Sequence, residues 1–440
     1  MKKLALVNMF IWIMIGMNNF LFSQGIEDLN IGFSKTFRSL KFDNKIPADC
    51  PFKKGNEIEE IEFTGRYANY TNADTWYPTW AGNDTLYSPW TDGYIFRTDK
   101  YEPYRKDHPG YASFSLDYLG RKASTSQAAI AGSDPLNLQI TNIMPSIEAS
   151  PKPYGGRYPC GSLLHNNIWY YGTYCVTENK KSKCNSVGWT ELGPFVGFRI
   201  SRDFGKSWIE TRLRPDSSLF NEKPDILKVK IGSPHFVDFG KNMMYSPDGY
   251  AYLTAHGSTD TNSCNGWIQG DEIYLIRVKP EPETINDIKS YKFFAGYDVN
   301  NFPVWSGSFK DIKPLLKWKE HLGCVTVTYN PYLKKYFMCI TRGVENTMFL
   351  RRYDTMILLA DSLTGTWRIN CYWESFGPVA YFVNIPSKFI STGGKTMWLT
   401  YSANWDNKNV NAFCGTPEGS YYSLSLHELK INKTKIHMKE

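Results

Sequence analysis

Short runs of aromatic and β-branched residues recur along the chain, and clusters of Gly, Pro, Asn and Asp separate them. Helical periodicity is nearly absent, so the pattern predicts an all-β chain. The runs group into five similar units of roughly 60–90 residues, each a hairpin followed by one or two further strands. About four short strands per unit are typical of a propeller blade. The pattern therefore predicts a five-bladed β-propeller.

Turn residues mark the middle of each expected hairpin. The turns are Asn83-Asp84, Asn166-Asn167, Ser246–Gly249, Asn330-Pro331 and Gly393-Gly394. These residue types supply turn geometry at little steric cost. Strands near residues 33–41 and 58–66 are expected to pair with the last unit and so to complete the ring.

One local motif supports the propeller. Residues 201–208, SRDFGKSW, have the form of an Asp-box, S-x-D-x-G-x-[ST]-W. Its Asp and Gly make a tight turn between outer strands, and its Trp packs beneath that turn. A partial copy spans residues 361–367 in the fourth unit. The motif is structural, so Asp203 is not expected to act as a catalytic acid.

The first residues have the form of an export signal. Lys2 and Lys3 precede an apolar run that ends near Phe22, and Ser23-Gln24-Gly25 fits a cleavage region. We expect residues 1–24 to be removed and residues 25–440 to form one propeller domain. No other apolar run is long enough to span a bilayer. These features predict an exported protein, periplasmic or secreted, that is monomeric and not inserted in a membrane.

The formal net charge is +7, and the basic excess is spread along the chain. This distribution argues mildly for an acidic substrate and against dedicated nucleic-acid binding. The chain also has 14 Trp, 29 Tyr and 26 Phe. Aromatic rings can stack on sugars, but they also fill β cores, so they discriminate little between functions.

All nine cysteines lie after the signal, in a compartment that permits disulfides. Cys175 and Cys184 are close enough in sequence to bridge a loop. Cys264, Cys324 and Cys339 follow the histidine-bearing third hairpin, where disulfides are the first expectation and a structural metal ion shared with a histidine is the alternative. No CxxC or HExxH spacing supports a metal site. No other cofactor is expected.

Polar residues on the first two strands of each unit are candidate site residues, because the innermost strands of a propeller line its channel. They are Asp74, Asp92, His165, His235, His256, Tyr329, Arg342, Asn384, Lys388 and Asn404. The third hairpin, residues 232–258, carries one histidine on each strand. Imidazole suits proton transfer near neutrality. Hydrogen-bonded structural histidines are the simpler interpretation of such a pair.

Two chemistries fit these residues. Glycoside hydrolysis needs two carboxylates, and Asp74 and Asp92 are the only obvious pair, although Asp92 precedes Gly93 and suits a turn. β-Elimination beside a uronate needs a base, a cation for the carboxylate and an acid for the leaving oxygen. A set for elimination lies on consecutive units: His235, His256, Tyr329, Arg342 and Lys388.

Several segments carry a resemblance to known proteins. They are DTWYPTWAGNDTLYSPWTDG, GSPHFVDFGKNMMYSPDGYAYL, YKFFAGYD, TYNPYLKKY and PSKFISTGGKTMWL. In these segments the chain resembles a broad group of bacterial five-bladed propeller proteins, the DUF4185-like group. The resemblance implies a link to polysaccharide breakdown, and the group includes hydrolases.

The order His, His, Tyr, Arg on successive hairpins also resembles that of ulvan lyases of marine bacteria and the ulvan-oligosaccharide dehydratases of marine Bacteroidetes. The resemblance implies that His235 and His256 act as base or orient the substrate. Tyr329 would then serve as acid or base, and Arg342 would neutralise the uronate carboxylate. Further substrate contacts are expected from Asp74, His165, Lys388 and Asn404.

Three functions remain open. The leading hypothesis is a carbon–oxygen lyase that acts on acidic, uronate-containing oligosaccharides, as a dehydratase or a polysaccharide lyase. The second is a glycoside hydrolase of the same propeller class, with Asp74 as a catalytic carboxylate. The third is a non-catalytic propeller that binds glycans.

Overall fold

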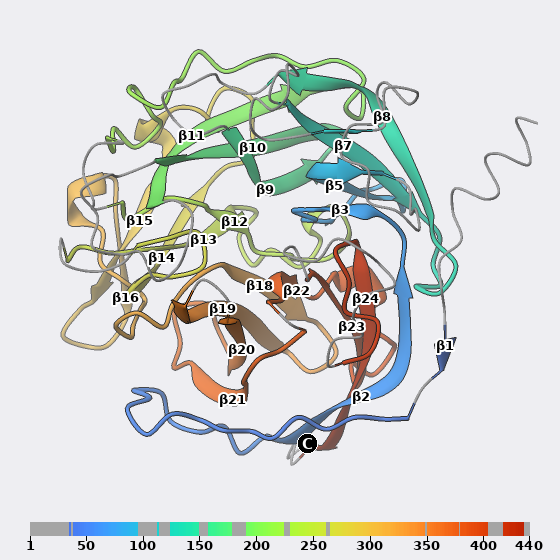
Figure 1. Ribbon diagram of the computed structural model, residues 1–440. Helices are drawn as coiled ribbons and strands as arrows, with labels where there is room; N and C mark the ends of the chain where they lie inside the picture. The colour runs from blue at the N-terminus through green and yellow to red at the C-terminus, as the bar shows by residue number, and fades with distance from the viewer. Residues whose placement is uncertain are drawn as a thin grey trace, which may run out of the picture.

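A computed structural model describes most of the chain after the signal region. The described residues are 35–36, 38–95, 112–113, 124–148, 157–177, 191–223, 229–260, 265–347, 350–377, 379–403 and 417–434. Five β-sheets surround a common centre in Figure 1. The five-bladed β-propeller expected from the sequence is therefore confirmed. The expected signal, residues 1–24, lies outside the described residues.

The first two blades follow the chain in order. Blade 1 contains β3 (Asn72–Asp74), β4 (Thr79–Trp80), β5 (Leu86–Tyr94), β6 (Ala112–Ser113), β7 (Ser124–Ala131) and β8 (Gln139–Glu148). Blade 2 contains β9 (Arg157–His165), β10 (Ile168–Thr177) and β11 (Glu191–Ser201). In both blades the strand nearest the centre comes first, as the propeller pattern requires.

Blades 3 and 4 have the same antiparallel order. Blade 3 contains β12 (His235–Phe236), β13 (Ala251–Gly257), β14 (Glu272–Val278), β15 (Lys292–Tyr297), β16 (Pro303–Ser306) and β17 (Leu316–Lys317). Blade 4 contains β18 (Val325–Asn330), β19 (Lys335–Thr347), β20 (Leu350–Ala360) and β21 (Arg368–Trp373).

Blade 5 joins the two ends of the chain. It contains β22 (Tyr381–Asn384), β23 (Thr396–Ser402), β24 (Ser425–Thr434), β2 (Ile58–Asn69) and β1 (Lys35–Thr36), in that order from the centre. The early strands thus pair with the last blade, as the sequence predicted. Antiparallel pairing of β2 with β24 brings Phe63 opposite Leu429 and Ile61 opposite Ile431.

Helical structure in the described residues is limited to single turns. These are the 3-10 turns η3 (Lys241–Met243), η4 (Ile288–Ser290), η5 (Phe309–Asp311) and η6 (Ser387–Phe389). Within the described ranges, no helix has the length and apolar character needed to cross a bilayer.

Hydrogen bonds between innermost strands link every pair of neighbouring blades. Thr79 of blade 1 accepts from Leu164 of blade 2 at 3.0 Å. The remaining links are Gly161 N to Pro234 O (2.8 Å), Asp238 N to Val327 O (2.8 Å), Thr326 Oγ1 to Val383 O (2.8 Å) and Asn384 Nδ2 to Trp76 O (3.2 Å). The ring of blades is therefore closed at the axis as well as at β2.

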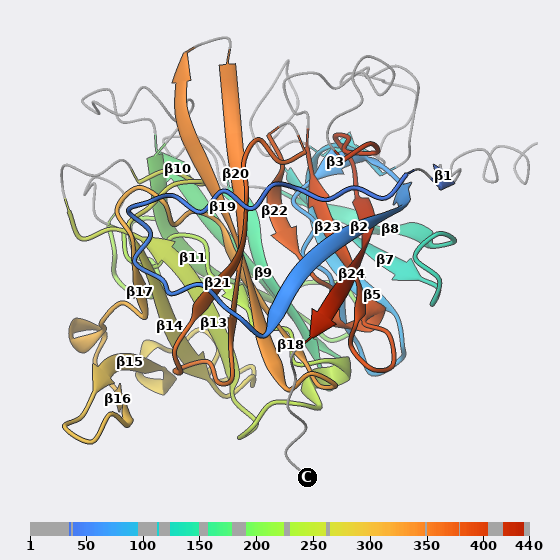
Figure 2. The same cartoon turned by 90° about the horizontal axis from the view of Figure 1, so that it is seen from below.

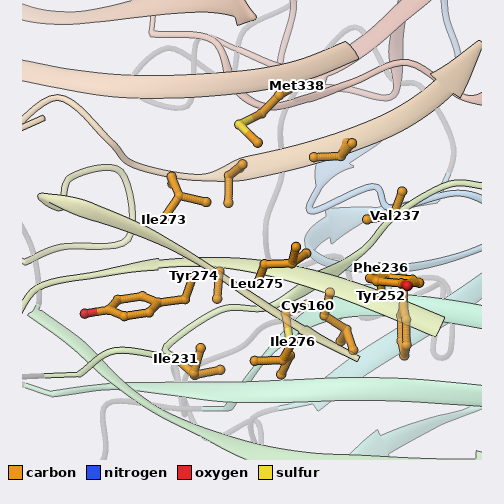
Figure 3. Packing of buried hydrophobic residues seen from close by; sticks show 14 of the residues in the cluster. Cys160, Ile231, Phe236, Val237, Tyr252, Ile273, Tyr274, Leu275, Ile276 and Met338 are labelled. Atoms are coloured by element: carbon orange, nitrogen blue, oxygen red, sulfur yellow. The ribbon is translucent and has the colours of Figure 1, made fainter. Parts of the chain in front are cut away.

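The core fills the spaces between blades. Figure 3 shows part of the largest cluster, which joins Ile273 and Leu275 of blade 3, Met338 of blade 4 and Cys160 of blade 2. All four side chains are fully buried. Because each blade can cover its faces only with its neighbours, this packing depends on a complete ring.

The Asp-box has the structural role expected for it. The Asp203 carboxylate accepts hydrogen bonds from Ser201 Oγ (2.8 Å) and from the Ser207 backbone N–H (2.8 Å). Gly205 has φ of +90°, a conformation that favours glycine. Trp208 packs on Trp169, with ring centroids 5.3 Å apart.

Ring closure can be tested at Phe63, which is 2% exposed and packs on Trp373 and Phe376. Phe63→Ala should lower the free energy of unfolding by about 3–5 kcal/mol, because it removes buried area and leaves a cavity. Phe302→Ala makes the same chemical change at a 67% exposed position, and its effect should stay within about 0.5 kcal/mol. Denaturant titration of both variants measures this difference, and equal losses would contradict the closure argument.

Candidate functional site

The axial channel has two mouths. We call the mouth where the innermost strands begin the upper mouth, which is uppermost in Figure 2, and the opposite one the lower mouth. Between them lies a cavity of about 40 Å³ lined by all five blades, including Tyr77, Ser162, His235, Thr326 and Asn384. A water needs roughly 10–15 Å³ of such volume. Among the described residues, this cavity therefore has room for a few waters and not for a sugar ring.

Asp74 lies at the upper mouth, in β3, which is the first part of the innermost strand of blade 1. Its carboxylate accepts a hydrogen bond from the Tyr381 hydroxyl at 2.7 Å, so blades 1 and 5 meet here. Asp74 is 8% exposed and Tyr381 is 1% exposed. Burial, and then the Asp74 charge, raises the pKa of Tyr381 well above its usual value. The tyrosine therefore stays protonated and donates to the carboxylate.

His235 and Tyr77 form a second contact across the axis. Their rings lie 4.1 Å apart between centroids. Burial, and then the neighbouring His256, lowers the pKa of His235 to about 3, so its imidazole is neutral near pH 7. The Tyr77 hydroxyl is buried and has no hydrogen-bond partner among the described residues. A neutral imidazole and an unengaged phenol thus lie side by side near Asp74.

His256 lies on the same face of blade 3 as His235. His235 is opposite Thr254 in the register of β12 and β13, and His256 follows two residues later. His256 Nε2 lies 2.9 Å from the Gly266 carbonyl oxygen, which requires Nε2 to donate. Burial lowers the pKa of His256 to about 4. This bond holds a neutral ring with Nδ1 as the acceptor.

An aromatic wall borders the upper mouth. Trp267 packs edge-on against Tyr381 at 5.1 Å and also contacts Phe382 and Tyr353. The Cys324 thiol donates to the Trp267 carbonyl at 2.6 Å, which ties this segment to blade 4. Trp267 is partly exposed, whereas Tyr381 is buried.

Asp92 belongs to the same neighbourhood. Its backbone has φ of +52°, and its carbonyl accepts from the Tyr422 hydroxyl at 2.6 Å. The Asp92 charge contributes to raising the pKa of Tyr381, after burial and Asp74. Asp74 thus contacts the Tyr381 hydroxyl directly, whereas Asp92 acts on it only through its charge.

Other candidates lie at the lower mouth. Tyr329 is next to the last residue of β18, where it packs on Tyr336 at 4.8 Å. His165 ends β9 and contacts the Asn242 carbonyl through Nδ1 at 3.1 Å. Lys388 donates to the Asp84 carbonyl and lies 3.8 Å from the Asp84 carboxylate. The structure thus separates these three residues from His235 and His256.

Arg342 points away from the axis. Its guanidinium reaches across β20 and donates to the Tyr372 hydroxyl at 2.9 Å, and that hydroxyl donates to Asp354 at 2.8 Å. Asp354 also forms a bidentate ion pair with Arg352. The structure does not bring Arg342 together with the histidines. Asn404 lies outside the described residues.

The expected disulfides are not formed by four cysteines that the structure describes. Cys50, Cys324, Cys339 and Cys371 are free thiols. Cys184 and Cys264 lie outside the described ranges. Within those ranges, no group of three His, Cys, Asp or Glu side chains is placed to hold a metal ion.

Sequence reasoning missed three residues of the upper mouth: Tyr77, Trp267 and Tyr381. Tyr381 is the first residue of the innermost strand of blade 5. That position in the strand pattern could have marked it as a candidate site residue. Tyr77 lies within the first hairpin, whose sequence indicated only the carboxylates as candidates. Trp267 lies in the connection between β13 and β14, and nothing in its sequence context distinguished it.

No protein-family model matches this chain, and no curated protein matches it. The chain is similar to several solved structures. One is a Bacteroides ovatus protein provisionally described as a hydrolase, with 11% identity, a TM-score of 0.46, and coverage of 88% of this chain and 95% of that chain.

Two glycoside-active proteins are also similar in structure. One is a family 117 glycoside hydrolase from the marine bacterium Zobellia galactanivorans, with 11% identity, a TM-score of 0.38 and 91% coverage of both chains. The other is an exo-1,5-α-L-arabinanase from a bovine ruminal metagenomic library, with 12% identity, a TM-score of 0.39, and coverage of 84% of this chain and 95% of that chain. At these scores the likenesses carry no argument about activity.

The neutral histidines predict a dependence of stability on pH. The pKa of His256 is about 4 in the folded protein and about 6.5 unfolded. The unfolded state therefore binds more protons between these values, and the free energy of unfolding should fall as pH drops from about 6.5 to 4. His256→Gln keeps an amide N–H for the Gly266 carbonyl but cannot titrate.

The comparison is made by denaturant titration at several pH values. The variant should lose less stability per pH unit than the wild type, by up to about 1.4 kcal/mol per unit. His427 remains in both proteins and contributes equally, whereas the pKa of His235 depends in part on His256. Parallel pH profiles would show that His256 is not a buried neutral group.

Proposed function

We propose that this propeller is a glycan-processing enzyme whose reaction takes place at the upper mouth, and that the reaction is hydrolysis of a glycosidic bond. The observation that carries the proposal is the position of Asp74. Its carboxylate lies at the upper mouth and accepts a hydrogen bond from the Tyr381 hydroxyl at 2.7 Å. Asp92 lies on the same hairpin and near the same tyrosine. Paired carboxylates are the usual groups for this chemistry.

In the proposed reaction Asp74 acts as the general base. It takes a proton from a water, and the water oxygen bonds to the anomeric carbon as the glycosidic C–O bond breaks. A second carboxyl group, assigned here to Asp92, gives its proton to the departing sugar oxygen. Tyr381 orients Asp74, and the partly exposed Trp267 offers a ring face for the sugar.

The surroundings support this assignment over elimination. His235 has a pKa of about 3, so its imidazole is a weak base for the C5 proton of a uronate. Arg342, the group expected to neutralise a uronate, is engaged with Tyr372. Tyr329 lies at the lower mouth. The elimination set is therefore dispersed, whereas Asp74 and Asp92 belong to one hairpin, in which Asp74 pairs with Thr91.

Asp74→Asn tests the proposal directly. Asparagine keeps an oxygen for Tyr381, so the melting temperature should stay near that of the wild type. Loss of the base should lower kcat by about 100- to 10,000-fold. The assay is release of reducing ends from arabinan, xylo-oligosaccharides and uronate-containing oligosaccharides. Asp134→Asn, an exposed change on the same blade, is the control and should leave kcat unchanged.

Elimination is the second candidate, supported by the neutral His235 beside the unengaged Tyr77 hydroxyl. In that reaction a base takes the C5 proton, a double bond forms between C4 and C5, and the C4 oxygen substituent leaves. The product absorbs near 235 nm, which hydrolysis products do not. Mass spectrometry separates loss of water from chain cleavage.

Arg342→Lys distinguishes the two reactions. Hydrolysis at Asp74 predicts a variant with activity within about twofold of the wild type, because Arg342 lies away from the axis. Elimination in which Arg342 holds the uronate carboxylate predicts a large loss, because lysine keeps the charge but lacks the bidentate fork. Elimination at His235 and Tyr77 without Arg342 is tested by the absorbance near 235 nm. Absorbance near 235 nm from the wild type, together with full activity of Asp74→Asn, would overturn the hydrolase proposal.

A further inference from the structure

Blade 3 carries an outer hairpin that the proposed reaction does not use. Strands β15 and β16 project from the rim of the propeller on the side of the lower mouth (Figure 2). A groove of about 680 Å³ follows this hairpin, and among its lining residues are Trp305, Lys310, Asp311 and Lys313. That volume lies in the range of ligand sites, roughly 300–1,000 Å³.

The groove gathers positive charge. Lys310 and Lys313 are both exposed, and neither amine has a hydrogen-bond or ion-pair partner among the described residues. The stem of Lys313 crosses the strand at Gly296, where an added Cβ would lie 3.1 Å from Lys313 Cδ. The groove also contains one carboxylate, Asp311, which accepts from Ser306 Oγ at 2.6 Å and keeps its negative charge, so the two lysines give the groove an excess of one positive charge.

An aromatic surface accompanies these cations. Trp305 is partly exposed, and the Arg277 guanidinium lies 4.2 Å from the centroid of its ring. Arg277 is held there by Asp248 at 2.8 Å. A further cation thus lies beneath the indole, and the rest of the ring borders the groove. Indole rings stack on sugar rings, and unpaired ammonium groups attract carboxylates or sulfates.

We infer that this groove binds a segment of an anionic polysaccharide, through uronate or sulfate groups, as a second glycan site apart from the upper mouth. The inference rests on the proposed glycan-processing function for the choice of a sugar polymer. The hairpin also exposes the apolar side chains of Val299, Phe302 and Val304, the last of which lines the groove. Binding to a membrane surface is therefore an outcome that the test must separate from glycan binding.

Binding can be measured without turnover, by calorimetry with the full chain. The probes are polygalacturonate for uronates, dextran sulfate for sulfates and unmodified dextran as the neutral polymer. The double variant Lys310→Gln/Lys313→Gln should bind one or both anionic polymers about 5- to 10-fold more weakly at low salt. The control Lys206→Gln/Lys395→Gln removes equal charge at exposed positions elsewhere and should bind like the wild type.

Two results would contradict the proposal that the groove binds an anionic polysaccharide. One is equal binding of the anionic polymers by both double variants, and the other is binding of dextran as tight as that of the charged polymers. Co-sedimentation with phosphatidylethanolamine/phosphatidylglycerol vesicles tests whether the groove binds a membrane surface instead. A loss of vesicle binding in the groove variant, with glycan binding unchanged, would assign the lysines to lipid and reject the proposal.

The experiments distinguish failure of the groove proposal from failure of the proposed hydrolysis. The Asp74→Asn protein should still bind the anionic polymers, because the groove lies on the outer part of blade 3. If the wild type cleaves glycans but the groove variant binds normally, the second site is wrong and the proposed function stands. If the lysines control binding but no glycan is cleaved, the groove stands and the hydrolase is wrong.

Discussion

The structure depends on the pairing of β2 with β24. A propeller is a ring made from an open chain, so its first and last segments must meet. Here the strand near residue 60 completes a blade built from residues beyond 380. The Arg66–Glu428 ion pair at 2.5 Å and the edge-on packing of Phe63 on His427 of β24 reinforce this contact. Because these contacts are far apart in sequence, their formation carries a large loop-closure entropy.

Closure of the ring determines how much space remains at the axis. With the ring complete, the innermost strands approach closely enough to exchange hydrogen bonds between every pair of neighbours. The interior is thereby reduced to a cavity of about 40 Å³. Among the described residues, the room for a substrate lies at the mouths, and the side chains where the innermost strands begin lie at the upper one. Asp74, His235 and Tyr381 meet at the upper mouth for this reason.

The two mouths differ in their electrostatics. At the lower mouth, Asp84 lies between Lys241 (3.2 Å) and Lys388 (3.8 Å), so its charge is satisfied within the protein. At the upper mouth, burial keeps the imidazoles of His235 and His256 neutral, and a carboxylate and tyrosines provide the polar groups. A network of satisfied ion pairs closes one end, whereas neutral donors and a carboxylate line the other.

The sequence by itself determined the class of fold, because turn residues and alternating apolar runs act locally. The Asp-box around Asp203 and the hairpin turns could be predicted from neighbouring residues alone. Those patterns also placed His235 and His256 on one face, since paired strands have a period of two. Tertiary structure decided which mouth each residue reaches. Tyr329 and His235 lie on equivalent strands, but one is near its strand's end and the other at its strand's beginning. Arg342 turned toward Tyr372, and Tyr381 toward Asp74, because those contacts join strands that lie far apart in the sequence.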